Sequence, residues 1–281
     1  MNENIAKEKE TALLKSLKEM GGILVAFSGG VDSTYLLSVS KDAVGVKNLM
    51  AVTATSSTYP QSELEEAKKL AKDLEVKHQV ITSEELEIDG FSDNPPDRCY
   101  YCKGELFTKL WEVAGTESIP FVLDGSNYDD IGDYRPGMQA AKEKKVSSPL
   151  KESKMTKEEI RFLSRERGLP TWDKPAYACL ASRFPYGDKI NAEKLKMVEK
   201  AEEFLKKTGF RQVRVRHHGD IARIEVAEEE MENLLVRNSS DSITKNIKDL
   251  GFTYVVVDLE GYRTGSMNQT LQEPFKKSSD N

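Results

Sequence analysis

Residues 23–33 read Ile-Leu-Val-Ala-Phe-Ser-Gly-Gly-Val-Asp-Ser, and this stretch decides the fold. Its five leading apolar residues predict a strand that is buried on both faces. Ser28-Gly29-Gly30 ends the strand, and Asp32 or Ser33 is placed to cap a helix that follows. A strand, a glycine turn and a helix N-terminus form an anion site, because unpaired backbone N–H groups and the positive end of the helix dipole point into the loop. The two glycines would let a phosphate approach the backbone closely.

The loop differs from the Walker A phosphate loop, which continues with Gly-Lys-Ser or Gly-Lys-Thr. No lysine is placed here to hold a transferring terminal phosphate. One interpretation is a Gly-Gly turn with a Ser or Asp cap and no ligand. The strand and helix context favours another, because the hexapeptide at 28–33 resembles the PP-loop of ATP pyrophosphatases, which bind ATP, adenylate a substrate and release pyrophosphate. That resemblance implies nucleotide contacts from Ser28, Gly29, Gly30, Asp32 and Ser33.

Strands and helices alternate through the first half of the chain. Further strands are expected at residues 49–54, 76–81 and 121–123, with an amphipathic helix at 61–74. The alternation predicts an α/β fold whose parallel sheet is connected by crossovers, with ligands beyond the carboxyl ends of the strands. The acidic stretch 124–130 then either helps to hold magnesium or substrate, or forms a solvated loop with turn chemistry.

The pattern changes after residues 170–187, a long stretch without clear periodicity. A loop of this length inside a compact protein is usually functional, and its aromatic content argues against disorder. A helix, a hairpin, two more helices and a last strand follow, which together predict a smaller α+β domain. We therefore expect a PP-loop domain at 1–187, a C-terminal domain at 188–270 that binds the substrate phosphate, and a flexible polar tail at 271–281.

Composition limits the class of protein. The 281 residues carry a net charge of −6, with 38% hydrophobic and 31% charged residues, as in soluble globular proteins. No apolar run approaches the roughly 20 residues of a membrane span, and the polar start Met1-Asn2-Glu3-Asn4 lacks a signal-peptide core. A cytoplasmic protein is the expectation, and the negative charge disfavours nucleic acid as a partner.

The hairpin expected at 211–226 carries a second polar centre. With a four-residue turn, Arg214 would lie directly opposite Arg223. Opposed like charges destabilise a strand pair, and an anion held between arginine forks would relieve the repulsion. The spacing is equally consistent with an exposed basic face whose positive charge is balanced by Glu225 and Asp220, with no bound anion.

The three cysteines, an odd number, exclude a complete disulfide framework. Cys99-x-x-Cys102 indicates metal or redox chemistry in a reducing compartment, and Cys179 is the candidate third thiolate. Three thiolates could hold a four-iron cluster with one iron open, provided that residues 170–187 fold back over the strand ends. The other interpretations are zinc with a histidine, a redox pair with Cys179 as nucleophile, and buried apolar cysteines. No histidine shows ligand spacing, which ranks zinc lower.

Several further motifs resemble those of the LarE sulfur transferases, and the match extends over nearly the whole chain. They are Asn94-Pro95-Pro96-Asp97-Arg98-Cys99-Tyr100-Tyr101-Cys102-Lys103, Gly125-Ser126-Asn127-Tyr128-Asp129-Asp130 with Asp133-Tyr134-Arg135-Pro136-Gly137, Pro175-Ala176-Tyr177-Ala178-Cys179-Leu180-Ala181-Ser182-Arg183, and Gly261-Tyr262-Arg263-Thr264-Gly265-Ser266.

The resemblance implies a substrate and a pathway. LarE proteins act in the synthesis of the nickel-pincer nucleotide cofactor of lactate racemase. With ATP and magnesium they adenylate a carboxylate of pyridinium-3,5-biscarboxylic acid mononucleotide, and then replace AMP by sulfur to give a thiocarboxylate. By motif, Asp32 would attend the pyrophosphate and magnesium, and Arg214 and Arg216 would hold the substrate phosphate. Glu202 and Glu225 would be further substrate contacts, and the family also suggests self-association.

The cysteines decide which form of the family the chain resembles. In one form a single cysteine, matching Cys179, gives up its own sulfur and becomes dehydroalanine. The sequence is similar instead to the three-cysteine form, in which Cys99, Cys102 and Cys179 hold a [4Fe-4S] cluster that passes on sulfur from an external sulfide donor. Sacrifice of Cys179, a PP-loop tRNA thiolase and a non-catalytic nucleotide or redox sensor are the alternatives. The acidic charge and the lack of an RNA-binding module disfavour the thiolase.

Overall fold

The computed structural model describes residues 1–131, 136–175, 178–263 and 265–270, without the side chains of residues 237–239 and 270. Its contacts form two compact units, one of residues 1–85 and 97–177, and one of residues 86–96 and 178 onward. In this division residues 178–187 go with the second unit, while the domain boundary expected after residue 187 stays a prediction. The expected tail and six residues of the quoted motifs lie outside the described residues, namely Asp133, Tyr134, Arg135, Ala176, Tyr177 and Thr264.

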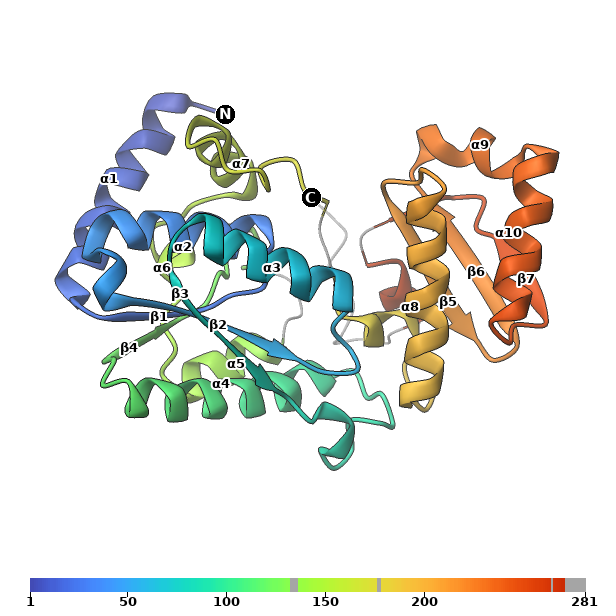
Figure 1. The fold of residues 1–281 in the computed structure, drawn as a ribbon, viewed down its shortest axis with the longest axis horizontal. Helices are drawn as coiled ribbons and strands as arrows, with labels where there is room; N and C mark the ends of the chain where they lie inside the picture. The colour runs from blue at the N-terminus through green and yellow to red at the C-terminus, as the bar shows by residue number, and fades with distance from the viewer. Residues whose placement is uncertain (132–135, 176–177, 264, 271–281) are drawn as a thin grey trace. The chain divides into compact units, whose positions relative to one another are not determined.

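The first unit is built on a four-stranded parallel sheet with the strand order β3-β2-β1-β4. The strands are β1 (Ile23–Ala26), β2 (Leu49–Thr55), β3 (Lys77–Thr82) and β4 (Phe121–Leu123). One face is covered by α1 (Glu3–Met20), α2 (Val31–Val44), α3 (Gln61–Asp73) and α7 (Lys157–Glu166), and the other by α4 (Arg98–Thr116) and α5 (Pro136–Glu143), as Figure 1 shows. A short helix, α6 (Pro149–Glu152), precedes α7. The predicted α/β fold with a parallel sheet is confirmed.

Strand β1 is buried on both faces, as its run of apolar residues predicts. Ile23 and Val25 belong to the core beneath α1, α2 and α7, whereas Leu24 packs into the second core with residues of α4 and α5. Successive side chains of a strand point to opposite faces, so a central parallel strand needs apolar residues at every position. The PP-loop therefore leaves the centre of the sheet at its carboxyl edge.

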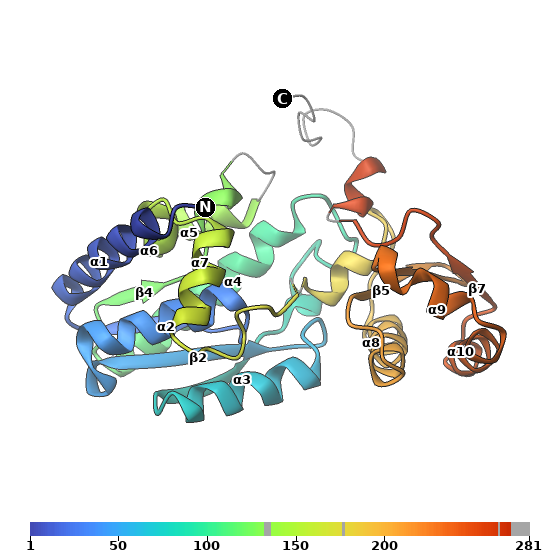
Figure 2. The ribbon, with the colours of Figure 1, turned by 90° about the horizontal axis from the view of Figure 1, so that it is seen from above.

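The second unit contains a three-stranded mixed sheet with the order β5-β6-β7. Strand β5 (Val213–His218) pairs antiparallel with β6 (Ile221–Val226), which pairs parallel with β7 (Tyr254–Val257). Figure 2 shows α8 (Ala192–Lys207) and α10 (Arg237–Asp249) on one face of this sheet, and α9 (Met231–Leu235) joins β6 to α10. The second, smaller α+β fold predicted from the sequence is thus present.

The register of the hairpin differs from the expected one. Its strands run to His218 and resume at Ile221, so the loop has two residues instead of four. Arg214 consequently lies opposite Glu225, and Arg216 lies opposite Arg223. The prediction that Arg214 opposes Arg223 is wrong because a hairpin's loop length fixes its register. The shift by two residues keeps every side chain on its predicted face.

No helix within the described ranges combines the length and the apolar character that crossing a membrane would require.

Candidate functional site

The PP-loop is shaped by hydrogen bonds among its own residues. Ser33 Oγ accepts from the Ser28 N–H at 3.3 Å and donates to the Gly30 carbonyl at 3.3 Å, and the two serine hydroxyls lie 3.1 Å apart. Gly29 has a φ of +64°, and an added Cβ would lie 3.1 Å from the Ala67 Cβ. Only glycine fits this position without strain, because the backbone is left-handed and α3 lies against it.

Helix α2 begins at Val31, so its N-cap lies two residues before Asp32, the first of the two caps that the sequence suggested. Gly30 is its N-cap, and no side chain of the described chain caps this end. The expectation that Asp32 or Ser33 caps the helix is wrong, because Asp32 lies inside the first turn and Ser33 bonds back to the loop. The first backbone N–H groups of α2 are thus left to solvent or to an anion, as a phosphate site requires.

Asp32 extends from this first turn and pairs with a lysine that the sequence analysis did not consider. Its Oδ2 accepts from Lys157 Nζ at 2.5 Å, while Oδ1 is buried and has no hydrogen-bond partner within the described part of the chain. Burial raises the pKa of Asp32 above its ordinary value. The charge of Lys157 and its hydrogen bond oppose this rise, the charge of Asp130 adds to it, and the nearby Asn127 amide lowers it.

A second lysine holds the other side of the loop. Lys174 Nζ donates to the Gly29 carbonyl at 3.2 Å and forms ion pairs with Glu63 and Glu66 of α3, both at 2.8 Å. Sequence reasoning missed Lys157 and Lys174, because each lies more than a hundred residues from its loop partner and shows no local pattern.

The acidic stretch after β4 forms turn and cap structure. Asp124 accepts from the backbone and the hydroxyl of Ser126, and Asp130 accepts from the Asn127 N–H in a capping box. Asp129 accepts from the Lys157 N–H at 2.7 Å, which fixes the start of α7. These contacts agree with the turn-chemistry interpretation, and the nearby Asp130 leaves a second carboxylate close to Asp32.

Cys99 and Cys102 both lie near the start of α4, which begins at Arg98. A spacing of three residues places both thiols on one side of a helix. Neither cysteine is in a disulfide, and Cys102 Sγ donates to Glu85 Oε1 at 3.5 Å. Cys179, also not in a disulfide, is exposed and belongs to the second unit. Among the described residues, no three His, Cys, Asp or Glu side chains gather into a metal-binding group.

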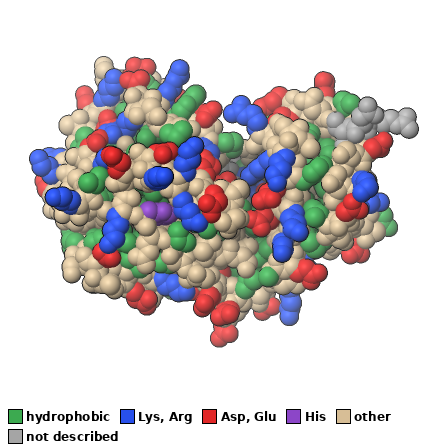
Figure 3. All heavy atoms as spheres, in the orientation of Figure 1, with side chains coloured by type: hydrophobic (Ala, Val, Ile, Leu, Met, Phe, Trp, Pro, Cys, Tyr) green, Lys and Arg blue, Asp and Glu red, His purple; other side chains and the backbone are tan. Residues whose placement is uncertain are grey.

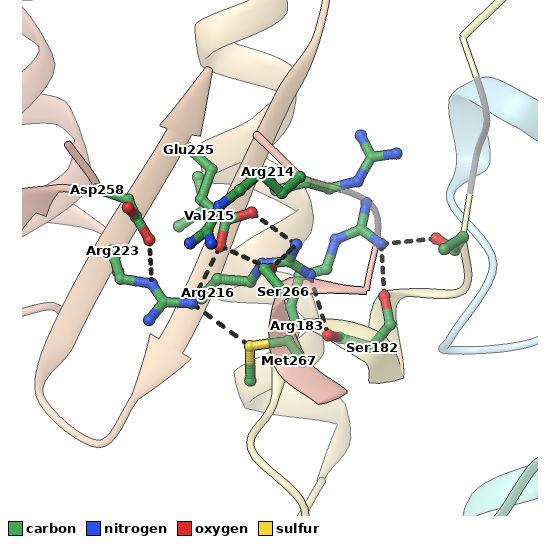
Figure 4. Close-up of polar contacts among 12 residues, drawn as sticks. Ser182, Arg183, Arg214, Val215, Arg216, Arg223, Glu225, Asp258, Ser266 and Met267 are labelled. Atoms are coloured by element: carbon green, nitrogen blue, oxygen red, sulfur yellow. Dashed lines mark hydrogen bonds and ion pairs between the residues drawn. The ribbon is translucent and has the colours of Figure 1, made fainter. Parts of the chain in front are cut away.

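The second unit contains a buried arginine–glutamate network, drawn in part in Figure 4. Arg183 is fully buried and pairs with both oxygens of Glu202, at 2.8 and 2.9 Å. Its remaining amino group donates to the carbonyls of Ala178 and Cys179, at 2.7 and 3.2 Å. Glu202 also accepts from the Val215 N–H at 2.9 Å. One ion pair therefore joins α8, β5 and the segment that carries Cys179.

Arg216 and Glu225 form the second pair of this network. Arg216 Nη2 donates to Glu225 Oε2 at 2.6 Å and to Ser266 Oγ at 3.0 Å, and its Nη1 donates to the Ser182 carbonyl at 3.1 Å. Arg223 donates to the other oxygen of Glu225 at 3.0 Å. Glu225 is fully buried, so the expected alternative of an exposed basic face does not describe this side of the hairpin.

Arg214 lies near the same network and is itself buried. Its guanidinium lies 5.1 Å from the centre of the Tyr262 ring, and its Nη1 donates to the Val213 carbonyl at 2.8 Å. Among the described residues, the network contains four arginines, Arg183, Arg214, Arg216 and Arg223, and three carboxylates, those of Glu202, Glu225 and Asp258. Guanidinium groups are well suited to binding an anionic ligand such as a phosphate.

The neighbouring arginines lower the pKa of Glu202. Burial alone would raise this pKa, but the charge and hydrogen bond of Arg183, the charge of Arg214 and the Val215 N–H together lower it below the ordinary value. Glu202 is therefore a carboxylate, and the network is held by charge. The predicted residues Arg214, Arg216, Glu202 and Glu225 all belong to it. Sequence reasoning quoted Arg183, Tyr262 and Ser266 in motifs but gave them no role.

Comparison with known proteins shows which families this chain is similar to. The sequence model of the NAD synthase family matches residues 6–92, which contain the PP-loop. The chain is 40% identical over 263 residues to the pyridinium-3,5-bisthiocarboxylic acid mononucleotide synthase of Lactiplantibacillus plantarum, covering 94% of this chain and 95% of that protein.

Two further relatives are uncharacterised proteins. One, from Synechocystis, is 43% identical over 253 residues, with coverage of 90% of this chain and 94% of that protein. The other, from Methanocaldococcus jannaschii, is 32% identical over 243 residues, with coverage of 86% and 91%. Because the identity with the Lactiplantibacillus synthase is 40% and covers nearly the whole length of both proteins, the chain belongs to the LarE family, of which that synthase is a member.

Proposed function

We propose that this protein is an ATP-dependent, adenylating sulfurtransferase that converts a carboxylate of pyridinium-3,5-biscarboxylic acid mononucleotide to a thiocarboxylate in nickel-pincer cofactor synthesis. The observation that carries the proposal is the uncapped N-terminus of α2 at the carboxyl edge of β1, with Asp32 in its first turn. Family membership supports the choice of substrate.

The chemistry has two steps that balance. A carboxylate oxygen of the substrate attacks the α-phosphorus of ATP, and pyrophosphate leaves. A sulfur nucleophile then attacks the acyl carbon, and AMP leaves with the carboxylate oxygen. The backbone N–H groups of Val31 and Asp32 would bind the phosphates, and the Asp32 carboxylate would be the magnesium ligand that its charge and position favour. Its Oδ1, which has no hydrogen-bond partner among the described residues, fits that role.

The arginine network supplies the substrate contacts. Arg214 and Arg216 are the phosphate ligands, because guanidinium forks match phosphate oxygens. Glu225 and Glu202 hold the arginines that neighbour them, and this ordering lowers the entropic cost of binding. The network also fixes the Cys179 main chain through Arg183.

The three thiols are the donors that such a cluster would take, with Cys99 and Cys102 on one helical turn and Cys179 exposed. A [4Fe-4S] cluster bound by Cys99, Cys102 and Cys179 would supply the sulfur from an external sulfide donor through its open coordination position. This source, unlike sacrifice of Cys179, allows many turnovers per chain.

The test is pyrophosphate release and sulfur incorporation, measured with ATP, sulfide and the pyridinium mononucleotide. The expected result is pyrophosphate release that depends on the mononucleotide, with a mass gain of the product. ATP binding without release would identify a nucleotide sensor. Sulfur incorporation into bulk tRNA with an inert mononucleotide would identify a tRNA thiolase instead. On the face in Figure 3, acidic and basic side chains are interspersed in both units, which offers no broad basic surface to RNA there.

A further inference from the structure

Lys157 reaches Asp32 from a position that is unusually well fixed. It is the first residue of α7, whose N-terminus is closed by a capping box between Thr156 and Glu159. Asp129 accepts from its backbone N–H, and Lys9 pairs with Glu159 at 2.7 Å. The backbone of Lys157 is therefore held beside the PP-loop, and only its long side chain is free to change direction.

The side chain has one acceptor. Within the described residues, Asp32 Oδ2 is the single hydrogen-bond acceptor of the Lys157 ammonium. The lysine side chain is 31% exposed and that of Asp32 21%, so the pair lies at the rim of the loop and water can reach the lysine. Water is therefore an alternative hydrogen-bond partner for the ammonium.

Divalent metals compete for the same oxygens. Magnesium demands oxygen ligands in near-octahedral geometry, and an ammonium bound to Asp32 Oδ2 occupies one of the two oxygens that this carboxylate offers. A metal at Oδ1 would lie within a few ångströms of the ammonium, where like charges repel. The ion pair between Lys157 and Asp32 and the binding of a metal to Asp32 therefore disfavour each other.

We propose that Lys157 is the counter-ion of Asp32 in the nucleotide-free protein. The Lys157 ammonium neutralises the Asp32 carboxylate there, and it moves away from that carboxylate when a divalent metal binds. The ammonium then moves to water or to the nucleotide's phosphates, and α7 keeps its backbone in place. This inference rests on the proposed function for the identity of the metal nucleotide. It adds a positioning residue whose partner changes during the reaction cycle.

The test uses Mn²⁺ in place of magnesium and needs no turnover. Mn²⁺ binding to the full chain without nucleotide is titrated by electron paramagnetic resonance in wild type, Lys157→Gln and Lys154→Gln. Lys154 is an exposed lysine of the preceding turn without an ion pair among the described residues, and it serves as the matched control. Lys157→Gln should bind Mn²⁺ about fivefold tighter or more, as removal of one nearby positive charge predicts. Lys154→Gln should equal wild type.

Two more measurements distinguish release of Lys157 from Asp32 from a simple electrostatic effect of the lysine on metal affinity. Acetylation of Lys157 by an amine-reactive reagent, followed by mass spectrometry, should increase when Mn²⁺ is added, whereas acetylation of Lys154 should not change. The thermal midpoint of metal-free Lys157→Gln should fall below that of wild type and recover with Mn²⁺. Unchanged Lys157 acetylation or unchanged Mn²⁺ affinity in Lys157→Gln would overturn the proposal. Neither result depends on adenylation, so failure here and failure of the proposed function are distinguishable.

Discussion

Arg183 fixes the main chain at Cys179: its guanidinium donates to the Cys179 carbonyl at 3.2 Å while it pairs with both oxygens of Glu202. The carbonyl also accepts from the Ser182 N–H at 2.9 Å, where a short turn of helix begins. The thiol itself is exposed. A buried ion pair thus holds the backbone of the residue whose sulfur chemistry is in question.

Glu202→Gln should destabilise the second unit and change its response to acid. Removing one partner of a buried ion pair costs about 3–5 kcal/mol, because the remaining charge is buried without compensation. The pKa of Glu202 is lowered in the folded protein, so its stabilising effect is complete above its ordinary pKa of about 4.3 and is lost as pH falls below that value.

Urea unfolding between pH 3 and 7 measures this effect. Wild type should lose stability steeply below about pH 4.5, and Glu202→Gln should show a shallower acid limb. Glu203→Gln, at the neighbouring and more exposed position, should follow wild type. An acid limb in Glu202→Gln as steep as that of wild type would mean that other carboxylates control acid unfolding.

Asp32→Asn should abolish pyrophosphate release while the fold survives. The neutral amide keeps the size of the side chain but is a poor magnesium ligand, and we expect a fall of about 100-fold or more in rate. Asp73→Asn, at the exposed end of α3, is the control and should leave the rate unchanged. Normal turnover in Asp32→Asn would remove Asp32 from the site.

Gly29→Ala should destabilise the first unit by about 1–2 kcal/mol, the cost of a left-handed backbone for a residue with a Cβ. Contact of the new methyl group with Ala67 adds to this cost. Gly104→Ala provides the opposite result within the same unit, since Gly104 lies inside α4 and an added Cβ meets nothing within 4 Å. It should stabilise by about 0.5–1 kcal/mol in denaturant unfolding. A harmless Gly29→Ala would contradict the loop geometry described above.

Arg214→Lys should weaken binding of the mononucleotide more than it slows turnover. Lysine keeps the charge but loses the planar fork and the stacking on Tyr262, so KM should rise about tenfold with a smaller change in kcat. Arg211→Lys, at an exposed position before β5, should match wild type. Equal losses of kcat and kcat/KM with constant KM would instead place Arg214 in the chemical step.

The cysteine variants test the source of the sulfur. Anaerobic reconstitution with iron and sulfide should give about four irons per chain, with the Mössbauer signals of a [4Fe-4S] cluster. Replacing Cys99, Cys102 or Cys179 by alanine should each reduce the iron content and end multiple turnover. The decisive measurement is the mass of the protein after turnover. Stoichiometric dehydroalanine at Cys179 would show that the chain gave its own sulfur and would overturn the cluster mechanism.

The sequence alone determined the α/β architecture and the position of the PP-loop. An uninterrupted apolar run at 23–27 followed by Gly29 and Gly30 needs a central parallel strand and a tight turn, and both are local requirements. The capping box between Thr156 and Glu159 is likewise a local pattern, because its partners are three residues apart. The faces of the hairpin followed from the two-residue period of a strand.

Only the tertiary structure decided which side chains meet. Lys157 pairs with Asp32 across 125 positions, and Arg183 pairs with Glu202 between a short turn of helix and α8. The register that places Arg214 opposite Glu225 depends on a two-residue loop. Local propensity and periodicity specify the helices, the strands and the faces that they bury. The partner of a buried charge is set by packing, because an unpaired buried charge is costly and any opposite charge that the fold brings near can neutralise it.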